Sequence, residues 1–377
     1  MSLPQTREDV IDRAKALLPT LRERAGRAEE LRRVPEETVR DFIDAGILRV
    51  GVPQKYGGVP VEYDVTFDAG MELGRACGAS AWCYSLWVVH NWLVGHFPAE
   101  AQEEYFATGP DTLCSSSFAG KGKLATPVDG GYRVSGHWEF SSGCDAATWA
   151  ELGVELPDGS QAWVLLPRRD YRIVDTWYVS GLSGSGSKDI VAEDAFVPSY
   201  RMLKPEDAEA YGTAFALHGT DCYHIPLRCI FGWDLLAPLI GVAQGVVDEF
   251  TLRTSRRGGV SGRDSALVQV RMAEASSEVD AAKALLHTDI AEMLDMGRKG
   301  VPITPLDRAR WVRDKAYAAK LSLQAVDRLF DISGGHALFS SEAIQRLHRD
   351  AQAMAHRDIM TLDFVGQTYG KLALGVE

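Results

Sequence analysis

The chain has 377 residues, of which 46% are hydrophobic and 24% are charged, so it can bury a large core divided over two or three domains. Its formal net charge of -12 at pH 7 argues against nucleic acid or an anionic membrane as the main partner, because both select basic surfaces. Six cysteines without a CxxC pair, no signal peptide and no apolar run long enough to span a bilayer point to a cytoplasmic protein that acts on small molecules.

The first hundred residues have a helical pattern. Val10 and Ala14 begin a run of apolar residues at three- and four-residue spacing, which is typical of one face of a helix. A further helix begins near Pro35, a residue favoured at the first helical position, and ends at Gly46, which is suited to a C-cap. We therefore predict an N-terminal helical domain over residues 1–112.

Near residue 112 the pattern changes to that of short strands. Alternating apolar and polar runs between Leu124 and Val197 are divided by turn residues, such as Asp129-Gly130-Gly131 and Pro157-Asp158-Gly159. This pattern predicts a compact β domain over residues 113–218.

A glycine-rich segment from Gly181 to Lys188 lies inside this domain and superficially resembles a phosphate-binding loop. Such a loop needs its lysine directly after the last glycine and a helix after the lysine. Here Ser187 intervenes, and residues 190–195 alternate as a strand does. The segment therefore lacks the pattern of a phosphate-binding loop, which makes an ATPase a poor interpretation. We expect its small residues to let the backbone approach a flat ligand closely.

After about residue 225 the helical pattern returns and continues to the end of the chain. Helices, then strands, then long helices predict an α+β fold that is mostly α, with an antiparallel helical bundle over residues 219–377. The long helices are expected near residues 230–256, 264–296, 306–332 and 342–356.

Several common catalytic motifs are absent from the sequence. It has no HExxH or other close metal-ligand spacing, no GxSxG and no GxGxxG. These absences argue against a zinc site, a serine hydrolase and a Rossmann dinucleotide domain.

Five stretches together extend over nearly the whole chain, in an order that is typical of one family. They are GILRVGVPQKYGG (46–58), GASAWCYSLWVVHNWLVGHFP (78–98), DGGYRVSGHWEFSSGCDAATW (129–149), GLSGSGSKDIVAEDAFVP (181–198) and QRLHRDAQAMAHRD (345–358). The set resembles the acyl-CoA dehydrogenase superfamily, and within it the group D flavin-dependent monooxygenases, the oxygenase components of two-component aromatic hydroxylases. The resemblance implies an acyl-CoA dehydrogenase-like fold with an N-terminal helical domain, a central β-barrel domain and a C-terminal four-helix bundle that forms a homotetramer.

The function that this resemblance implies is hydroxylation of an aromatic or polycyclic small molecule. Reduced FMN or FAD would come from a separate flavin reductase and react with O2 to form a C4a-hydroperoxyflavin. Two alternatives stay open at this stage: oxygenation of an amine or amino sugar on the same fold, and acyl-CoA dehydrogenation with FAD. Acyl-CoA dehydrogenases carry a glutamate base within a YEGT motif. At the corresponding position this chain has Asp358, within His356-Arg357-Asp358-Ile359. The combination of an RDA motif with His356 resembles the oxygenase branch.

The resemblance also implies which residues form the site. The catalytic candidates are His90 on the substrate side, Ser142 at the flavin N5 edge with Ser141 as a substitute, His356 facing the same cavity as His90, and Asp358. The residues expected to bind the cofactor are Trp138, Ser141, Ser142, Ser116, Ser117, Arg256, Arg257 and Arg263, with Ser115 as a further phosphate contact. The expected apolar walls are Trp82, Trp87, Trp92, Trp138 and Phe140.

Overall fold

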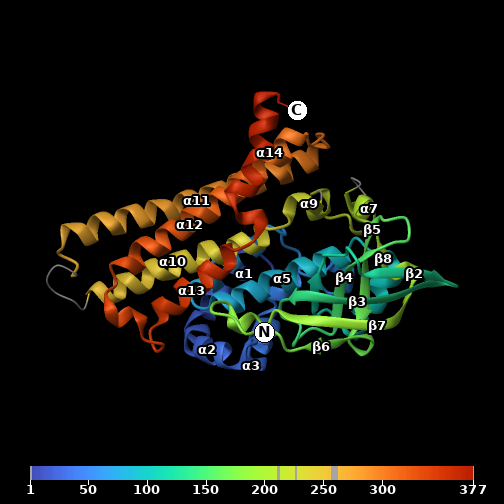
Figure 1. The fold of residues 1–377 in the computed structure, drawn as a ribbon, viewed down its shortest axis with the longest axis horizontal. Helices are drawn as coiled ribbons and strands as arrows, with labels where there is room; N and C mark the ends of the chain where they lie inside the picture. Colours follow the sequence, from blue (N-terminus) through green and yellow to red (C-terminus); the bar gives the residue numbers. More distant parts are fainter. Residues whose placement is uncertain (1, 210–212, 226, 256–261, 377) are drawn as a thin grey trace.

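The computed structural model describes residues 2–209, 213–225, 227–255 and 262–376. Helices form one side of the molecule and a sheet domain forms the other (Figure 1). This arrangement confirms the expected fold class. The helices of the N-terminal part are α1 (Arg7–Ala16), α2 (Leu18–Leu31), α3 (Glu36–Ala45), α4 (Val65–Gly74), α5 (Gly78–Val94) and α6 (Ala99–Tyr105).

The central part is one eight-stranded sheet. Its hydrogen-bonded order is β6-β7-β3-β2-β4-β5-β8, and β1 pairs in parallel with β4. The longest strands, β3 and β7, pair antiparallel and present their ends to the helices (Figure 1). The strands are β1 (Cys114–Ser117), β2 (Leu124–Val128), β3 (Gly131–Ser141), β4 (Trp149–Glu155), β5 (Gln161–Pro167), β6 (Arg172–Val174), β7 (Lys188–Pro198) and β8 (Met202–Leu203).

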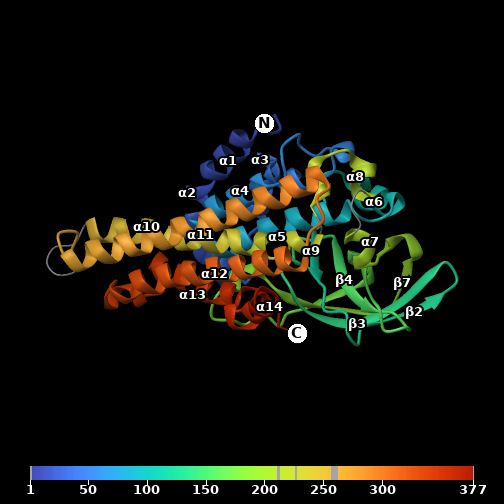
Figure 2. The same ribbon diagram turned by 90° about the horizontal axis from the view of Figure 1, so that it is seen from above.

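The C-terminal part contains four long helices that lie side by side (Figures 1 and 2). They lie close to the four ranges expected from the sequence, but α14 was not predicted. None of its residues is buried, and it projects from the body of the molecule. The helices are α7 (Pro205–Glu209), α8 (Thr213–His218), α9 (Leu227–Ile230), α10 (Trp233–Ser255), α11 (Ala266–Lys299), α12 (Pro305–Asp331), α13 (Ala343–Ala355) and α14 (Leu362–Leu374).

The α10 helix corrects the expectation that no segment is long and apolar enough to span a bilayer. Of the described residues, those of α10 alone form a helix long and apolar enough to cross a membrane by length and composition. However, 72% of its most apolar window is buried inside the structure. Because α10 packs against α4, α5, α12 and α13, it has the environment of a core helix.

The helix α5 connects the helical part to the sheet domain. It packs against α4 and α10 on one side and against β1 on the other. Nearly all of its side chains are buried, so the aromatic residues of this helix form the centre of the molecule. Two of the expected cavity walls, Trp87 and Trp92, are fully buried core residues, and this is a correction to the prediction.

Candidate active site

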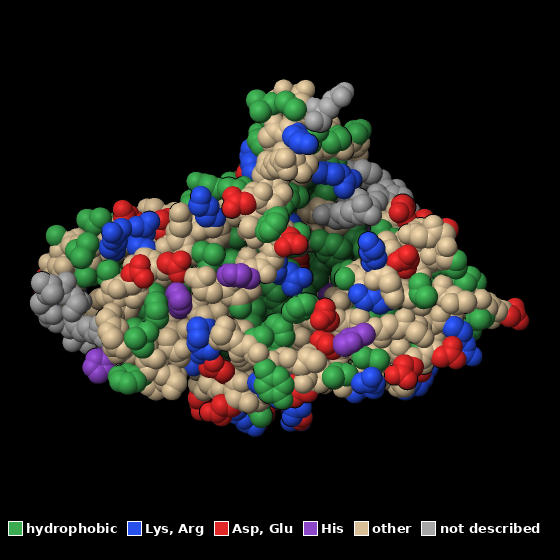
Figure 3. Space-filling model, in the orientation of Figure 1, with side chains coloured by type: hydrophobic (Ala, Val, Ile, Leu, Met, Phe, Trp, Pro, Cys, Tyr) green, Lys and Arg blue, Asp and Glu red, His purple; other side chains and the backbone are tan. Residues whose placement is uncertain are grey.

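The molecule is hollowed where the helices meet the sheet domain, and hydrophobic side chains gather in this hollow (Figure 3). A cavity of about 410 Å³ opens here, which we call the first cavity. Trp82 of α5 lines one wall, and the sheet side of the cavity is formed by Phe140, Ser142, Trp177, Leu182 and Ser187. Its bundle side comes from the end of α13 and the following 3-10 turn η10 (Asp358–Met360).

A second cavity of about 330 Å³ adjoins the first. It extends toward β1 and α5, where it is lined by His90, Ser116 and Phe118. The two cavities share four lining residues. The shared residues are Trp82, Phe140, Ser142 and Arg357.

A β-bulge at the end of β3 directs Phe140 into both cavities. The register with β7 shifts between Trp138 and Ser141, and Phe140 has a left-handed φ of 64°, which is unusual for a bulky residue. Strict alternation would place Phe140 on the same face as Trp138. The bulge separates them, so Phe140 is 59% exposed while Trp138 is fully buried.

Ser142 follows the bulge and lies in a chain of hydrogen-bonded hydroxyls. Its Oγ accepts a hydrogen bond from Trp82 Nε1 at 3.2 Å and lies 2.6 Å from Ser187 Oγ. Ser187 Oγ in turn lies 2.7 Å from Ser185 Oγ. When Ser187 donates to Ser142, the Ser142 hydrogen is free to bond an acceptor edge of a ligand in the cavity.

His90 is held in a defined tautomer. Its Nδ1 lies 2.8 Å from the carbonyl oxygen of Cys114, and because a carbonyl only accepts, Nδ1 carries the proton. Burial lowers the pKa of His90 to about 4, so the ring is neutral at pH 7. Nε2 therefore accepts a hydrogen bond from Ser116 Oγ at 2.7 Å, and Ser116 can accept a further one from a ligand hydroxyl.

The glycine-rich loop is held by α13. Leu182 N donates to the Asp350 carboxylate at 2.7 Å, and Leu182 O accepts from Trp177 Nε1 at 3.0 Å. A Cβ on Gly181 would lie 2.0 Å from the Arg349 carbonyl oxygen. Gly181 therefore allows close packing against α13, while Leu182 and Ser187 of the same loop line the first cavity. Close approach of this loop to a flat ligand stays a prediction.

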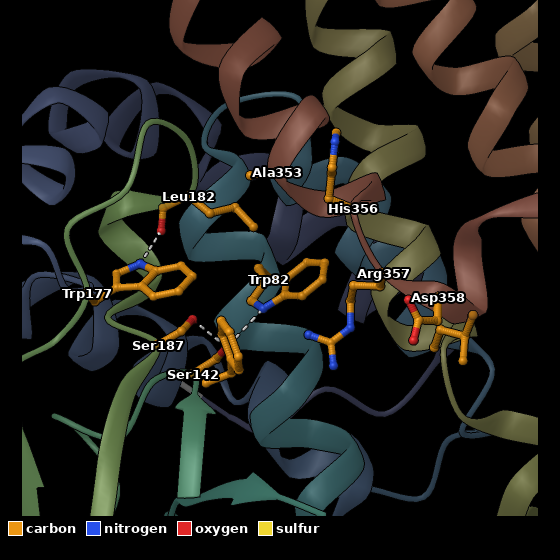
Figure 4. Close-up of a pocket in the computed structure, with 11 residues that line it drawn as sticks. Trp82, Ser142, Trp177, Leu182, Ser187, Ala353, His356, Arg357 and Asp358 are labelled. Carbon is orange, nitrogen blue, oxygen red and sulfur yellow. Dashed lines mark hydrogen bonds between the residues drawn. The ribbon is translucent and has the colours of Figure 1, made fainter. Parts of the chain in front are cut away.

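His356 and Asp358 both line the first cavity and both are exposed. His356 Nδ1 donates to the carbonyl oxygen of Gln352 at 2.7 Å, and Figure 4 shows the ring directed away from Trp82 and Ser142. His90 lines the second cavity. The two histidines therefore line adjoining cavities, which corrects the expectation that they face the same one.

Other candidates lie away from the cavities. Trp138 is buried in the core of the sheet domain, where its Nε1 donates to Gly153 O at 2.7 Å. Ser141 is fully buried and donates to Ser115 Oγ at 2.9 Å. Neither Trp138 nor Ser141 lines the first or the second cavity, which corrects the expectation that both lie at the cofactor site.

The phosphate candidates divide in a similar way. Ser116 and Ser117 line the second cavity, and Ser117 Oγ donates to Glu139 O at 2.8 Å. Arg263 is exposed in the turn before α11. The α11 helix begins at the end of the bundle that lies farthest from the sheet domain (Figure 1). Arg256 and Arg257 lie outside the described residues. In the single chain, Arg263 lines neither the first nor the second cavity.

The first cavity fits a flat heteroaromatic cofactor such as the isoalloxazine of a flavin. Trp177, Phe140 and Trp82 supply aromatic walls, and Ser142 and Ser187 supply hydroxyls at one edge. Ligand sites typically combine apolar walls with a few placed polar groups in volumes of this order.

Sequence reasoning missed six of the residues that line the first cavity: Trp177, Leu182, Ser187, Ala353, Arg357 and Ile359. Ser187 had a visible signal, because it is the residue that interrupts the phosphate-loop pattern. Arg357 stands between two residues that were proposed. Trp177 lies in the long connection between β6 and β7. The sequence carries no comparable signal that this connection lines a cavity.

The comparisons with known proteins agree with this geometry. Residues 5–109 match the family model described as the acyl-CoA dehydrogenase N-terminal domain, and residues 235–360 match that of the C-terminal domain. The chain is 38% identical to the flavin-dependent monooxygenase oxygenase subunit HsaA of Rhodococcus jostii, over 91% of this chain and 92% of that protein. It is 34% identical to the FADH(2)-dependent resorcinol hydroxylase oxygenase component of a Rhizobium species, over 98% and 94%.

Among solved structures, the HsaA monooxygenase from M. tuberculosis has a TM-score of 0.93 to this chain at 34% identity. The match covers 99% of both chains. The same fold therefore extends from end to end of both proteins.

Proposed function

The chain belongs to the acyl-CoA dehydrogenase family, and within it to the flavin-dependent monooxygenase oxygenase subunits; from this premise we propose that it hydroxylates a phenolic compound beside Ser142. It is the oxygenase component of a two-component system that uses reduced FMN or FAD, supplied by a separate flavin reductase. Its substrate class is an aromatic or polycyclic small molecule. The observation that carries the proposed site is the His90–Ser116 pair in a cavity that continues to Ser142.

Reduced flavin, when bound, supplies the electrons that activate dioxygen. Ser142 and Ser187 would hold its polar edge, and Trp177 and Phe140 would cover its faces. Trp82 and Phe140 line both cavities, and these apolar side chains limit the water that can reach the reacting atoms beside them. We assign Ser142 a positioning role through its hydroxyl hydrogen, which the Trp82 and Ser187 contacts leave available.

The proton of the substrate hydroxyl leaves through Ser116 and His90. A phenol in the second cavity can donate to Ser116 Oγ, while Ser116 donates to His90 Nε2. Moving this proton raises electron density on the aromatic ring, which favours attack on an electrophilic oxygen. General base catalysis of this kind contributes about 10²- to 10⁴-fold.

The proposal includes a homotetramer and a cytoplasmic location. The exposed apolar side chains of α14 support the assembly, since Phe364 is 67% exposed and Leu374 is 80% exposed in one chain. Large exposed apolar side chains grouped on one element are typical of interfaces between protein chains. The reduced cysteines of the described residues are consistent with the location.

The test of the function is a turnover assay with a generic NADH-dependent flavin reductase, FMN or FAD, air and a panel of phenols. We expect a hydroxylated product that carries one atom from isotopically labelled dioxygen. Oxidised flavin without reductase should give no product. Release of hydrogen peroxide alone, with every phenol recovered unchanged, would falsify the proposal.

The same assay separates the alternatives. An acyl-CoA dehydrogenase would reduce an electron-accepting dye with an acyl-CoA substrate in the absence of dioxygen, and an amine oxygenase would consume an amine and leave the phenols unchanged. We expect neither, because a carboxylate base would have to be Asp358, which is exposed and, among the described residues, has no hydrogen-bond partner for its carboxylate.

The pH dependence should reflect the neutral state of His90. Its pKa is lowered to about 4 by burial, so the base form persists as pH falls and is lost only when Nε2 is protonated. We expect the single-turnover hydroxylation rate constant to change by less than about twofold between pH 8 and pH 6. Rapid-mixing assays with quantified product would check this, and an acid limb near the ordinary histidine pKa would contradict the buried environment.

A further inference from the structure

Arg357 places a cation in the wall that the two cavities share. It lines both the first and the second cavity. Figure 4 shows its side chain running from the chain after α13 toward Trp82 and Ser142. Its guanidinium carbon lies 5.9 Å from the centroid of the Trp82 ring, a distance at which a cation is attracted to the ring face.

This guanidinium has donors to offer. Within residues 2–209, 213–225, 227–255 and 262–376, it forms no hydrogen bond and no ion pair. Other arginines of the chain are paired in forks, such as Arg49, whose Nε and Nη2 donate to Asp111 at 2.8 and 2.7 Å. Because Arg357 is exposed within the cavity wall, its donors are open to a ligand that enters the cavity.

Two carboxylates act on the charge of Arg357, but neither forms an ion pair with it in the described part of the chain. Asp234 and Asp358 both influence its charge electrostatically. However, Asp234 is 3% exposed and its Oδ1 accepts from Gly232 N at 2.8 Å, while Lys315 lies close enough to stabilise its charge. Asp358 follows Arg357 in the chain, on the bundle side of the first cavity.

The second cavity carries one positive charge in excess. Its ionisable lining residues are Lys123, Glu139 and Arg357, together with the neutral His90. Of these charged groups, Arg357 alone belongs also to the first cavity. The cavity that contains the Ser116 hydroxyl therefore has a free cation in its wall.

We propose that the substrate is an aromatic compound with a phenolic hydroxyl and a carboxylate, and that Arg357 binds the carboxylate while Ser116 receives the hydroxyl. The inference rests on the proposed function, which it refines by naming the substrate class. A guanidinium matches a carboxylate with two parallel hydrogen bonds, and such charge-assisted bonds are stronger than neutral ones. Arg357 is then a specificity-determining residue.

The test is a binding measurement that needs no turnover. Titration calorimetry on the flavin-free protein compares para-hydroxyphenylacetate with its primary amide, and para-hydroxybenzoate with its amide to vary the reach. Of the two carboxylates, we expect the one with the higher affinity to bind about 10- to 100-fold more tightly than its own amide. Arg357→Met should remove this preference and change the affinity for the amide by less than about twofold.

Two further variants keep the result unambiguous. Arg357→Lys retains the charge without the fork and should retain part of the preference. Arg22→Met makes the same change in net charge at an exposed position of α2 and should leave the preference intact. Circular dichroism of each variant checks that the fold is unchanged.

The outcomes distinguish this inference from the proposed function. Equal affinity for acid and amide in the wild type, equal weakening of both by Arg357→Met, or no binding of any of the four compounds would overturn the role of Arg357. A preference for the acid that Arg357→Met removes would support it. If that preference is found but no hydroxylated product forms in the turnover assay, the proposed function fails while the anion site stands.

Discussion

Replacement of His90 by alanine is expected to lower the rate constant of aromatic hydroxylation by about 10²- to 10⁴-fold, the range for loss of a general base. In the wild type, Nε2 accepts from Ser116 Oγ at 2.7 Å, and Nδ1 is fixed by the Cys114 carbonyl. Alanine removes the acceptor, so Ser116 has no partner to which it can pass the substrate proton. Single-turnover mixing of reduced flavin, protein and phenol with dioxygen, with quantified product, measures the loss.

The controls separate a missing base from a disturbed core. His96→Asn removes another buried histidine, which follows α5 and packs against Trp92 and Tyr223 outside both cavities. It should affect stability more than hydroxylation. Ser116→Ala should cost less than His90→Ala, and the double variant should cost no more than His90→Ala alone, because residues of one proton path act as a unit.

A His90→Ala protein that folds, binds reduced flavin and hydroxylates at nearly the wild-type rate would contradict the assigned role. In that case the His90–Ser116 hydrogen bond would be a means of fixing β1 against α5. Loss of flavin binding together with hydroxylation would also assign His90 to structure, since the base role predicts that binding survives.

The arrangement of the long helices could be predicted from the sequence because apolar periodicity records which face is buried. The observed α10 to α13 lie within a few residues of the expected ranges. The α14 helix could not be predicted in this way. It packs against α12, but none of its residues is fully buried in the single chain, so its apolar pattern does not mark a face that one chain buries.

Site residues could be predicted where the type of residue marks them. They could not be predicted where their position depends on an irregular backbone, such as a β-bulge. His90 and Ser142 were named from the sequence and both line the cavities. Trp138 and Phe140 were both named as aromatic walls, and their spacing of two residues in β3 would place them on one face of a regular strand. The bulge at Phe140, with its φ of 64°, breaks that equivalence, and no local composition rule announces a bulge of this kind.

Long-range contacts account for the remaining difference. Leu182 and Trp177 reach the cavity because α13 holds the loop between β6 and β7 from the other end of the sequence. The contacts of α13 with this loop also explain the RDA motif, Arg349-Asp350-Ala351. Arg349 donates to Ser180 O and to Glu29, and Asp350 accepts from Leu182 N, so two stretches with separate sequence patterns form one wall.

Replacement of Asp350 by alanine should therefore release this wall. Leu182 has a left-handed φ of 56° and is held at its N by Asp350 and at its O by Trp177. Without the carboxylate, a buried N–H has no acceptor, a loss of about 1–3 kcal/mol. That corresponds to about a 5- to 150-fold fall in the ratio of closed to open loop. Hydrogen exchange at the Leu182 amide should accelerate accordingly.

An open wall admits water to the first cavity, so the chemistry should become uncoupled. We expect Asp350→Ala to release several-fold more hydrogen peroxide per NADH than the wild type while forming less product. The measurement is product and peroxide quantified together against NADH consumed. Gln352→Ala removes a side-chain hydrogen bond from the same helix to Asp327 Oδ1 on α12 at 2.7 Å, and should leave coupling unchanged.

Asp350→Asn keeps an oxygen acceptor for Leu182 and should couple nearly as well as the wild type. It also removes a buried charge, since burial raises the pKa of Asp350 to about 6. Below the ordinary aspartate pKa both folded and unfolded forms are protonated; as pH rises, the unfolded form ionises first, which disfavours folding of the wild type. The stability of Asp350→Asn relative to wild type should thus increase between pH 4 and pH 7. If Asp350→Asn uncouples the reaction as strongly as Asp350→Ala, the hydrogen bond to Leu182 does not hold the wall.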